Sequence, residues 1–308
     1  MVINMIQTVK GAILASELGV TMCHEHLALD LSPVRGDQDS NFDDSRLVCK
    51  EIEKMKALGV QSVIEVTCND MGRDVRKLRE YSETCGIHIV ASTGYYLKEY
   101  HSEFVKNAAP EELCEVFCRE ITEGIDGTDI KAGIIGEVAS GEPAMGESGK
   151  KVLTAAAMAG KITQTAVTTH CQLGKLGLEQ LELLQRYGME SNKIILGHLD
   201  LANDRDYYET LLKTGVNIGF DTIGKTGYLG DEKRADNLMY LIERGWEEQI
   251  VLSQDISRKS YFSEYGTYSG YMAVMKNFVP LLKEKGIKKE TLDKLLIYNP
   301  ARILDKKS

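Results

Sequence analysis

The sequence predicts an α/β protein whose fold class is the (β/α)8 TIM barrel, preceded by a short N-terminal hairpin. A chain of 308 residues fits one such barrel. Apolar runs of strand length alternate with stretches of helical periodicity, and this succession is typical of parallel βαβ units. Five helical stretches are followed by a glycine, as helix C-caps often are: Gly59, Gly86, Gly188, Gly215 and Gly245. A doubly wound open sheet is the alternative, and it usually has fewer strands.

The elements follow one another regularly along the chain. A hairpin over residues 6–18, turning at Gly11, comes first. The predicted strands are residues 21–26, 62–67, 88–92, 132–138, 166–170, 193–198, 216–220 and 250–253. The predicted helices are residues 45–58, 73–84, 110–123, 150–161, 176–187, 204–213 and 231–244, then 270–285 and 289–297, which we expect Asn299-Pro300 to end. No composition break divides the chain, so residues 1–308 are expected to form one domain, with the hairpin at 1–19 and the barrel at 20–308.

Composition and charge exclude several classes of function. A net charge of -9 and a pI of about 5.3 disfavour nucleic acid and anionic membranes as partners. The N-terminus lacks the pattern of a signal peptide, and no apolar run is long enough to span a bilayer. The seven cysteines are odd in number and include no C-x-x-C pair, so free thiols in a reducing compartment are expected. We therefore expect a cytoplasmic protein.

The candidate functional residues are polar side chains at the ends of predicted strands. Reactive residues of a parallel barrel lie at the C-terminal ends of its strands, and residues i and i+2 of one strand face the same side. Taken singly, each candidate also fits a cap, a hydrogen bond or an ion pair with a lysine. Together they are expected at the mouth of the barrel: His24, His26, Glu137, His170, His198 and Asp255.

Imidazole and carboxylate ligands in this mixture favour Zn, Mn or Fe over Ca or Mg. The pattern predicts two metal ions, one held by His24, His26 and Asp255 and the other by His170 and His198. Two dications repel each other strongly, and the carboxylate of Glu137 can bridge them with its two oxygens. The other two histidines, His88 and His101, lie at a strand start and in a loop, and they are expected to be structural or exposed to solvent.

The sequence resembles the phosphotriesterase-homology family of the amidohydrolase superfamily over nearly its whole length. The motifs that carry the resemblance are Thr8-Val-Lys-Gly11, Glu17-Leu-Gly19, His24-Glu-His26-Leu27, Gly124-Ile-Asp-Gly-Thr128, Lys131-Ala-Gly-Ile-Ile-Gly-Glu137, His170, Gly197-His198, Phe220-Asp-Thr-Ile-Gly-Lys225 and Ser253-Gln-Asp255. The resemblance implies a barrel with a binuclear metal centre. In that centre the ligands are the two histidines of strand one, those of strands five and six, and the aspartate of strand eight.

One departure from the best-known members of the family concerns the bridging ligand. The phosphotriesterases bridge their metals with a carboxylated lysine of strand four, but residues 133–140 contain no lysine, and Lys131 stands at the start of the strand. Glu137 instead resembles the bridging glutamate of the homology-protein branch. This puts organophosphate hydrolysis in doubt as the native activity.

The expected chemistry is hydrolysis by a metal-bridging hydroxide, because metal binding lowers the pKa of water by many units. Asp255, which would contact both metal and hydroxide, is expected to shuttle the proton to the leaving alkoxide. Tyr96 matches a family tyrosine near the metals and is expected to hydrogen-bond the substrate or to serve as an aromatic wall. Zinc is the expected metal, and manganese or cobalt also suits the ligand set.

The substrate is expected to be a small molecule, and the loops after strands three, seven and eight are expected to determine which one. Lys225, Arg258 and Tyr261 could together bind an anion. The trio is similar to the phosphate-binding residues of the family's sugar-phosphate lactonases, which implies a phosphorylated sugar aldono-1,4-lactone as substrate. The alternatives are another lactonase or carboxylesterase, a promiscuous phosphotriesterase, and a metal-binding barrel without catalysis. A homodimer could form through two tyrosine pairs that we expect to be exposed, Tyr95-Tyr96 and Tyr207-Tyr208.

Overall fold

The structure is a computed structural model that describes residues 4–141 and 143–307. Its centre is a wall of strands that pair in parallel throughout. Hydrogen-bonded neighbours run in the order β11-β10-β9-β8-β7-β6 and β3-β4-β5, and only Ala91 separates β5 from β6. The strands are β3 (Thr21–Glu25), β4 (Ser62–Glu65), β5 (His88–Val90), β6 (Ser92–Thr93), β7 (Ile134–Ala139), β8 (Val167–His170), β9 (Ile194–Gly197), β10 (Asn217–Phe220) and β11 (Ile250–Leu252). The predicted (β/α)8 barrel is confirmed.

The barrel closes where the first strand meets the last. The backbone N–H of His24 donates to the hydroxyl of Ser253 at 3.0 Å, just beyond β11. The buried carboxylate of Glu25 accepts from the Ser253 hydroxyl at 2.6 Å and from the backbone N–H groups of Gln254 at 3.0 Å and Ile256 at 3.1 Å. One carboxylate thus anchors the segment that follows β11 to the end of β3.

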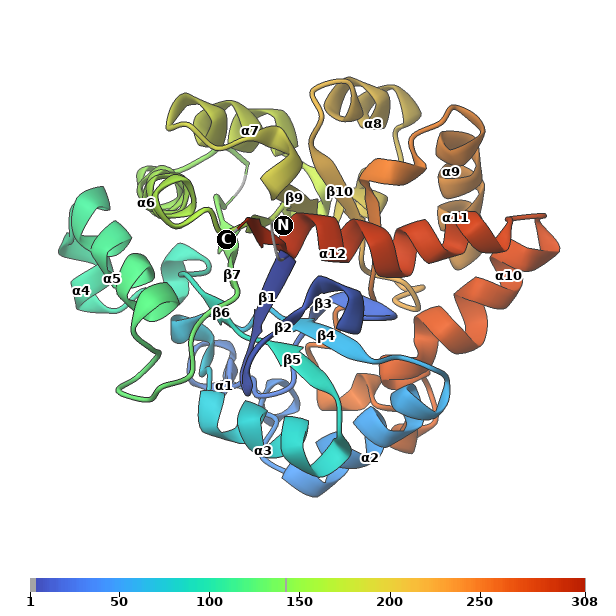
Figure 1. Cartoon of the computed structure of the whole chain (residues 1–308), viewed down its shortest axis with the longest axis horizontal. Helices are drawn as coiled ribbons and strands as arrows, with labels where there is room; N and C mark the ends of the chain where they lie inside the picture. Colours follow the sequence, from blue (N-terminus) through green and yellow to red (C-terminus); the bar gives the residue numbers. More distant parts are fainter. Residues whose placement is uncertain (1–3, 142, 308) are drawn as a thin grey trace.

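Helices surround the strands (Figure 1). Asp44, Asp74 and Asp204 cap three of them by accepting backbone N–H groups of the first turn, which are otherwise unpaired. The surrounding helices are α2 (Ser45–Ala57), α3 (Val75–Cys85), α5 (Pro110–Thr122), α6 (Glu147–Thr163), α7 (Gly177–Arg186), α8 (Arg205–Leu212), α9 (Asp231–Glu243) and α10 (Val279–Glu284). Each lies where the sequence predicts a helix. Two short helices in the loops, α1 (Ser32–Arg35) and α4 (Glu103–Asn107), have no counterpart in the prediction.

The N-terminal hairpin and the last helix cover one end of the barrel. Strands β1 (Asn4–Thr8) and β2 (Gly11–Leu14) pair antiparallel, and β12 (Lys306–Lys307) pairs with β1. Figure 1 shows β1 and α12 (Asn299–Leu304) crossing the barrel on the side that faces the viewer. Ile6, Leu18 and Ile303 belong to one buried cluster with the apolar side chains of the barrel interior. The carboxyl ends of the strands therefore open at the other end.

The predicted helix end at Asn299-Pro300 is wrong. A π-helical segment, Lys294–Tyr298, follows α11 (Lys289–Asp293) and leads directly into α12. Pro300 is the second residue of α12, where the π-helical segment gives way to α-helix. The chain therefore continues as a helix to Leu304 and reaches the barrel end.

The expected exposure of the tyrosine pairs is also wrong. Tyr95, Tyr96 and Tyr208 are buried. Tyr95 packs on Phe117 with ring centroids 5.5 Å apart, and the hydroxyl of Tyr208 donates to the backbone carbonyl of Asp200 at 3.1 Å. These rings are part of the core and cannot form an interface.

All seven cysteines are free thiols, as the sequence predicts. Within the described residues, no helix combines the length and the apolar character needed to cross a membrane.

Candidate active site

Four imidazoles and one carboxylate meet at the open end of the barrel. Glu137, in β7, lies at their centre. Its Oε2 is 2.9 Å from His170 Nδ1, 3.3 Å from His198 Nε2 and 3.4 Å from His24 Nε2. Its Oε1 is 3.3 Å from His26 Nε2. The structure thus brings together five residues that the sequence singles out, although they come from four different strand ends.

The ligand atoms of these residues form two groups that share Glu137. One group is His24, His26 and Glu137, and the other is Glu137, His170 and His198, with the ligand atoms of each group within 4.8 Å of one another. Both ring nitrogens of His24 are buried and form no well-aligned hydrogen bond among the described residues, although carboxylate oxygens lie 3.3 and 3.4 Å from them. Buried polar atoms usually have partners. This donor set therefore fits two cations that share one carboxylate.

Asp255 lies beside this cluster. Its Oδ1 is 3.3 Å from His26 Nε2, and its Oδ2 contacts the ammonium group of Lys225. Burial raises the pKa of Asp255, but Lys225 and His26 outweigh it and hold the pKa below its usual range. The carboxylate is therefore ionised at neutral pH and can accept a hydrogen bond or coordinate a cation.

The buried carboxylates of the cluster favour a positive charge on the groups beside them. Burial lowers the pKa of His198, yet the carboxylates of Asp221 and Glu137 outweigh it and raise the pKa to about 10. The pKa of His24 is raised for the same reason, while the surrounding imidazoles hold the pKa of Glu137 well below its usual range. The carboxylates stabilise a positive charge on the neighbouring imidazoles. They stabilise metal cations in the same way, and protons and metal ions compete for the same ring nitrogens.

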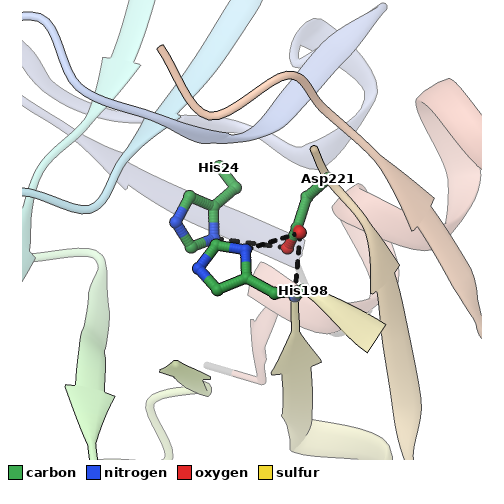
Figure 2. Close-up of side chains that lie close together, drawn as sticks. All are labelled: His24, His198 and Asp221. Carbon is green, nitrogen blue, oxygen red and sulfur yellow. Dashed lines mark hydrogen bonds and ion pairs between the residues drawn. The ribbon is translucent and has the colours of Figure 1, made fainter. Parts of the chain in front are cut away.

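Asp221, which follows β10, orients two of the imidazoles and is missing from the sequence prediction. Figure 2 shows its carboxylate beside the rings of His24 and His198, with a dashed line to each residue. Its Oδ1 accepts from the backbone N–H and Nδ1 of His198, at 2.8 and 2.9 Å, and its Oδ2 is 3.3 Å from His24 Nδ1. A carboxylate on Nδ1 fixes the tautomer of a histidine and leaves Nε2 free to bind a metal. The available signal was its position at a strand end, the same criterion that selects Glu137.

Glycines make room for this arrangement. A Cβ on Gly219 would lie 2.3 Å from Asp221 Oδ2, which is too close for any real contact. Gly136, with φ +116°, precedes Glu137, and a Cβ there would lie 2.0 Å from the backbone oxygen of Thr168. Side chains at either position would displace the carboxylate that follows in the sequence.

His26 is supported from the neighbouring strand. Its Nδ1 lies 2.9 Å from the hydroxyl of Thr67, which donates to Glu65 at 2.5 Å. Glu65 also accepts the backbone N–H of Leu27 at 3.1 Å. The ring of His26 is therefore held with Nε2 toward Glu137 and Asp255. Of the remaining histidines, His101 is buried and bonded to Ser148 at 2.8 Å, which fits the structural role expected of it.

A cavity of about 140 Å³ opens above the cluster. The strand-end residues form its floor, and loop residues form its walls. Its lining comprises His26, Leu31, Arg35, Met71, Tyr96, Glu137, His170, Gln172, Leu173, His198, Leu201, Thr222, Lys225, Tyr228, Asp255 and Ser257. Arg35, Gln172 and Tyr228 have no place in the sequence prediction, because they lie in loops whose course it does not define.

Tyr96 reaches the cluster from the loop after β6. Its hydroxyl is 3.4 Å from His170 Nδ1, and the two rings meet edge to face at 5.0 Å. Asp70 accepts the backbone N–H of Tyr96 with both oxygens, at 3.0 and 3.1 Å. Burial raises the pKa of Tyr96, so its hydroxyl remains a hydrogen-bond donor at neutral pH.

The three predicted anion-binding residues are divided between the cavity and its rim. Lys225 lines the cavity and lies over the ring of Tyr261, with its ammonium 5.4 Å from the ring centroid. Arg258 does not line the cavity. Its Nη1 is 3.4 Å from Asp37 and 3.5 Å from Asp39, so two carboxylates already face its charge.

Comparisons with known proteins agree with this geometry. The sequence model of the Phosphotriesterase family matches residues 4–304. The phosphotriesterase homology protein of Escherichia coli (strain K12) is 37% identical over 284 residues, which are 92% of this chain and 97% of that protein. N-acetyltaurine hydrolase of Danio rerio is 30% identical and covers 97% of both chains.

Solved structures of such relatives share the fold. Phosphotriesterase homology protein from E. coli, complexed with phosphate in the active site, superposes with a TM-score of 0.91 at 36% identity, over 94% of this chain and 99% of that one. The lactonase Lmo2620 from Listeria monocytogenes gives a TM-score of 0.93 at 27% identity over 99% of both chains. Enzymes of the phosphotriesterase family are binuclear metal hydrolases, and the clusters around Glu137 are candidate ligands for such a centre. The chain belongs to the phosphotriesterase family and is a metal-dependent hydrolase of ester bonds.

Proposed function

We propose that this protein opens a lactone, and that its substrate is a phosphorylated sugar aldono-1,4-lactone. The observation that carries the proposal is the position of Lys225. Its ammonium group lies inside the cavity, next to Asp255 and 3.4 Å from the hydroxyl of Ser257. Although this ammonium group also contacts Asp255, its positive charge beside the reacting centre favours a substrate with an anionic group near its scissile bond. Two relatives agree with this: one is a lactonase, and another binds phosphate in its active site.

The proposed ligands of the metals are His24, His26, Glu137, His170, His198 and Asp255. Two divalent metals, with zinc expected and manganese or cobalt also suited, would supply an activated water and polarise the ester carbonyl. Asp255 would accept the proton that the attacking water loses and pass it to the leaving alkoxide oxygen. Lys225 and His26 keep this carboxylate ionised, so it is ready to accept.

Tyr96 has a proposed role in holding the substrate. Its hydroxyl faces the cavity beside His170. Because burial keeps the phenol protonated, it can donate a hydrogen bond to an oxygen of the lactone. The hydrogen bond that the backbone N–H of Tyr96 donates to Asp70 fixes the loop that carries the tyrosine.

The phosphate is proposed to bind on Lys225, with Tyr261 and Arg258 nearby. Tyr261 flanks the ammonium group. Arg258 would share its charge with Asp37 and Asp39, so its contribution is expected to be smaller than that of Lys225. The small cavity, with charged walls, suits a small polar lactone better than an acyl-homoserine lactone with a long chain.

A second candidate is the hydrolysis of an amide that carries an anionic group. The Danio rerio relative is an N-acetyltaurine hydrolase, and a sulfonate would suit Lys225 as well as a phosphate does. Amide hydrolysis would use the same proton acceptor, Asp255, to protonate a leaving amine.

The test is a panel of substrates given to zinc-loaded protein. We expect kcat/KM for phosphorylated aldonolactones to exceed that for the unphosphorylated lactones by about 10- to 100-fold, the effect of one or two charge-assisted contacts. Lys225→Gln should remove this preference, whereas Lys233→Gln, a change at an exposed lysine of α9, should preserve it. Equal rates on both kinds of lactone would reject the phosphate proposal.

The same panel separates the alternatives. Faster turnover of N-acetyltaurine would select the amide reaction, and faster turnover of a phosphotriester would select the phosphotriesterase. Two bound metals without turnover of any ester, lactone or amide would indicate a binding protein. We also propose a cytoplasmic location, which the free cysteines favour, and leave a homodimer to be tested by sedimentation.

A further inference from the structure

Arg35 is a cation of the active-site cavity that neither the sequence motifs nor the reaction outlined above uses. It is the last residue of α1, in the loop that follows β3. Gly36, with φ +69°, turns the chain directly after it, in a conformation that favours glycine. The half-buried side chain lines the cavity together with Leu31, Met71 and Tyr96. Arg35 is the arginine of that lining, and Lys225 is its lysine.

The charge of Arg35 is not matched by a carboxylate. Its Nε donates to the neutral hydroxyl of Tyr100 at 3.2 Å, and among the described residues it forms no ion pair. The nearby Asp37 instead accepts the backbone N–H of Ser40 at 3.0 Å and faces Arg258. Lys225, by contrast, is paired with Asp255. Arg35 is therefore the guanidinium of the cavity that remains available to a ligand.

Arg35 and Lys225 reach the cavity from different loops. The ring of Tyr100 packs at a tilt against the ring of Tyr96, with their centroids 5.4 Å apart, and Tyr96 contacts His170. These tyrosines belong to the loop after β6, whereas Lys225 follows β10. Arg35 itself follows β3, which adjoins β11, and its Nε contacts Tyr100 of the loop after β6.

We propose that Arg35 binds a second oxyanion of the substrate, separate from the group that Lys225 binds. The inference rests on the proposed function and narrows it: the substrate carries two anionic groups, each a carboxylate or a phosphate. A guanidinium presents paired N–H donors that match either oxyanion, and Tyr100 holds this one in place through Nε, leaving both terminal nitrogens to the ligand.

The test measures binding rather than turnover, with zinc-loaded protein and unreactive probes. The probes are linear diol bisphosphates of increasing length, each compared with its monophosphate, and the matching carboxyalkyl phosphates. We expect wild-type protein to bind one length of doubly charged probe at least about tenfold more tightly than the monophosphate. Whether the preferred second group is a carboxylate or a phosphate follows from the two series.

The variants assign this preference to a residue. Arg35→Gln should abolish the difference in affinity between doubly and singly charged probes. Arg35→Lys should restore part of that difference, because lysine returns the charge but not the paired N–H donors. Arg46→Gln, at an arginine whose side chain is 94% exposed, is the control and should bind as wild type does. Thermal melting establishes that each variant is folded.

Two results would overturn the inference. One is a wild-type protein that binds singly and doubly charged probes equally at every length, and the other is an Arg35→Gln variant that keeps the preference. The result is independent of lactone turnover. If the substrate panel shows no lactonase activity while the Arg35-dependent preference is present, the proposed function fails and the second anion site stands.

Discussion

Asp221 holds His198 at two points: a single carboxylate oxygen accepts both the backbone N–H, at 2.8 Å, and the ring Nδ1, at 2.9 Å. The backbone and the ring of the histidine are therefore fixed by the same group. The other oxygen of Asp221 faces His24, so one buried carboxylate orients imidazoles from both candidate metal positions.

Asp221→Asn should weaken metal binding without removing a proposed ligand. The amide has one acceptor oxygen instead of two, so one of the two imidazoles loses its orienting partner. We expect the affinity for zinc to fall by about 10- to 100-fold, measured by competition with a chromogenic chelator. Asp129→Asn, at a carboxylate whose side chain is 81% exposed, is the matched control. Unchanged zinc affinity in Asp221→Asn would show that the carboxylate does not support the centre.

Gly219→Ala should displace the carboxylate of Asp221. The new Cβ would lie 2.3 Å from Asp221 Oδ2, so the carboxylate must move. We expect weaker zinc binding and a loss of about 1–3 kcal/mol in the free energy of unfolding, as is usual for overpacking. Gly227→Ala is a suitable control, because nothing lies within 4 Å of a Cβ at that position. If both variants bind zinc equally well, the close contact at Gly219 does not control the site.

Asp70 should make stability depend on pH in the direction opposite to an ordinary surface carboxylate. Burial raises its pKa from 3.8 to about 7 in the folded protein. Between these values the folded state holds a proton that the unfolded state has lost, so stability falls as pH rises through this window. Each unit of difference is worth about 1.4 kcal/mol.

Asp70→Asn tests this dependence, because asparagine cannot ionise but can still accept the backbone N–H of Tyr96. Urea unfolding at several pH values should show the variant gaining stability relative to wild type as pH rises from about 4 to about 7, with a constant difference at higher pH. A relative stability that stays flat across this range, or that changes in the other direction, would contradict the assignment.

Arg234→Met should be strongly destabilising. This fully buried arginine donates to Asp200 at 2.6 Å, to Asp231 at 2.8 Å and to the hydroxyl of Thr222 at 2.8 Å. Its removal leaves the buried carboxyl group of Asp200 without its cation, which typically costs about 3–5 kcal/mol of unfolding free energy. Urea denaturation measures the loss.

Two further variants distinguish the possible causes of that loss of stability. Arg244→Met removes a half-exposed arginine that pairs with Glu209, and it should cost less than about 1 kcal/mol. Adding Asp200→Asn to Arg234→Met should recover part of the stability, because the unpaired buried charge disappears. If the double variant is no more stable than Arg234→Met, the lost contacts rather than the charge account for the effect.

The sequence predicts the barrel and the floor of the site well because both follow from local rules. Alternating apolar runs and helix caps define the strands and helices, and the geometry of a parallel barrel brings the strand ends together. His24, Glu137 and His198 could therefore be placed near one another without any knowledge of the loops. Asp221 also lies at a strand end, so the same rule could have identified it.

The walls of the cavity could not be predicted in the same way. Whether an arginine of a loop faces a ligand depends on which carboxylates other loops place beside it. Arg258 lies against Asp37 and Asp39, which are more than two hundred residues away in the sequence, whereas Arg35 donates a hydrogen bond to the hydroxyl of Tyr100 and forms no ion pair within the described part of the chain. Periodicity and spacing contain no information about such contacts. The anion-binding role of Arg258 remains a prediction.

The contact between Glu25 and the segment after β11 has a consequence for the order in which the protein can mature. Glu25 stands between the first two proposed metal ligands, and the groups it accepts are 228 to 231 residues further along the chain. During synthesis, the N-terminal histidines leave the ribosome long before the segment carrying Asp255 exists. A nascent chain that lacks this segment can therefore offer a metal only part of the site, and complete metal loading has to wait until the segment after β11 has closed the barrel.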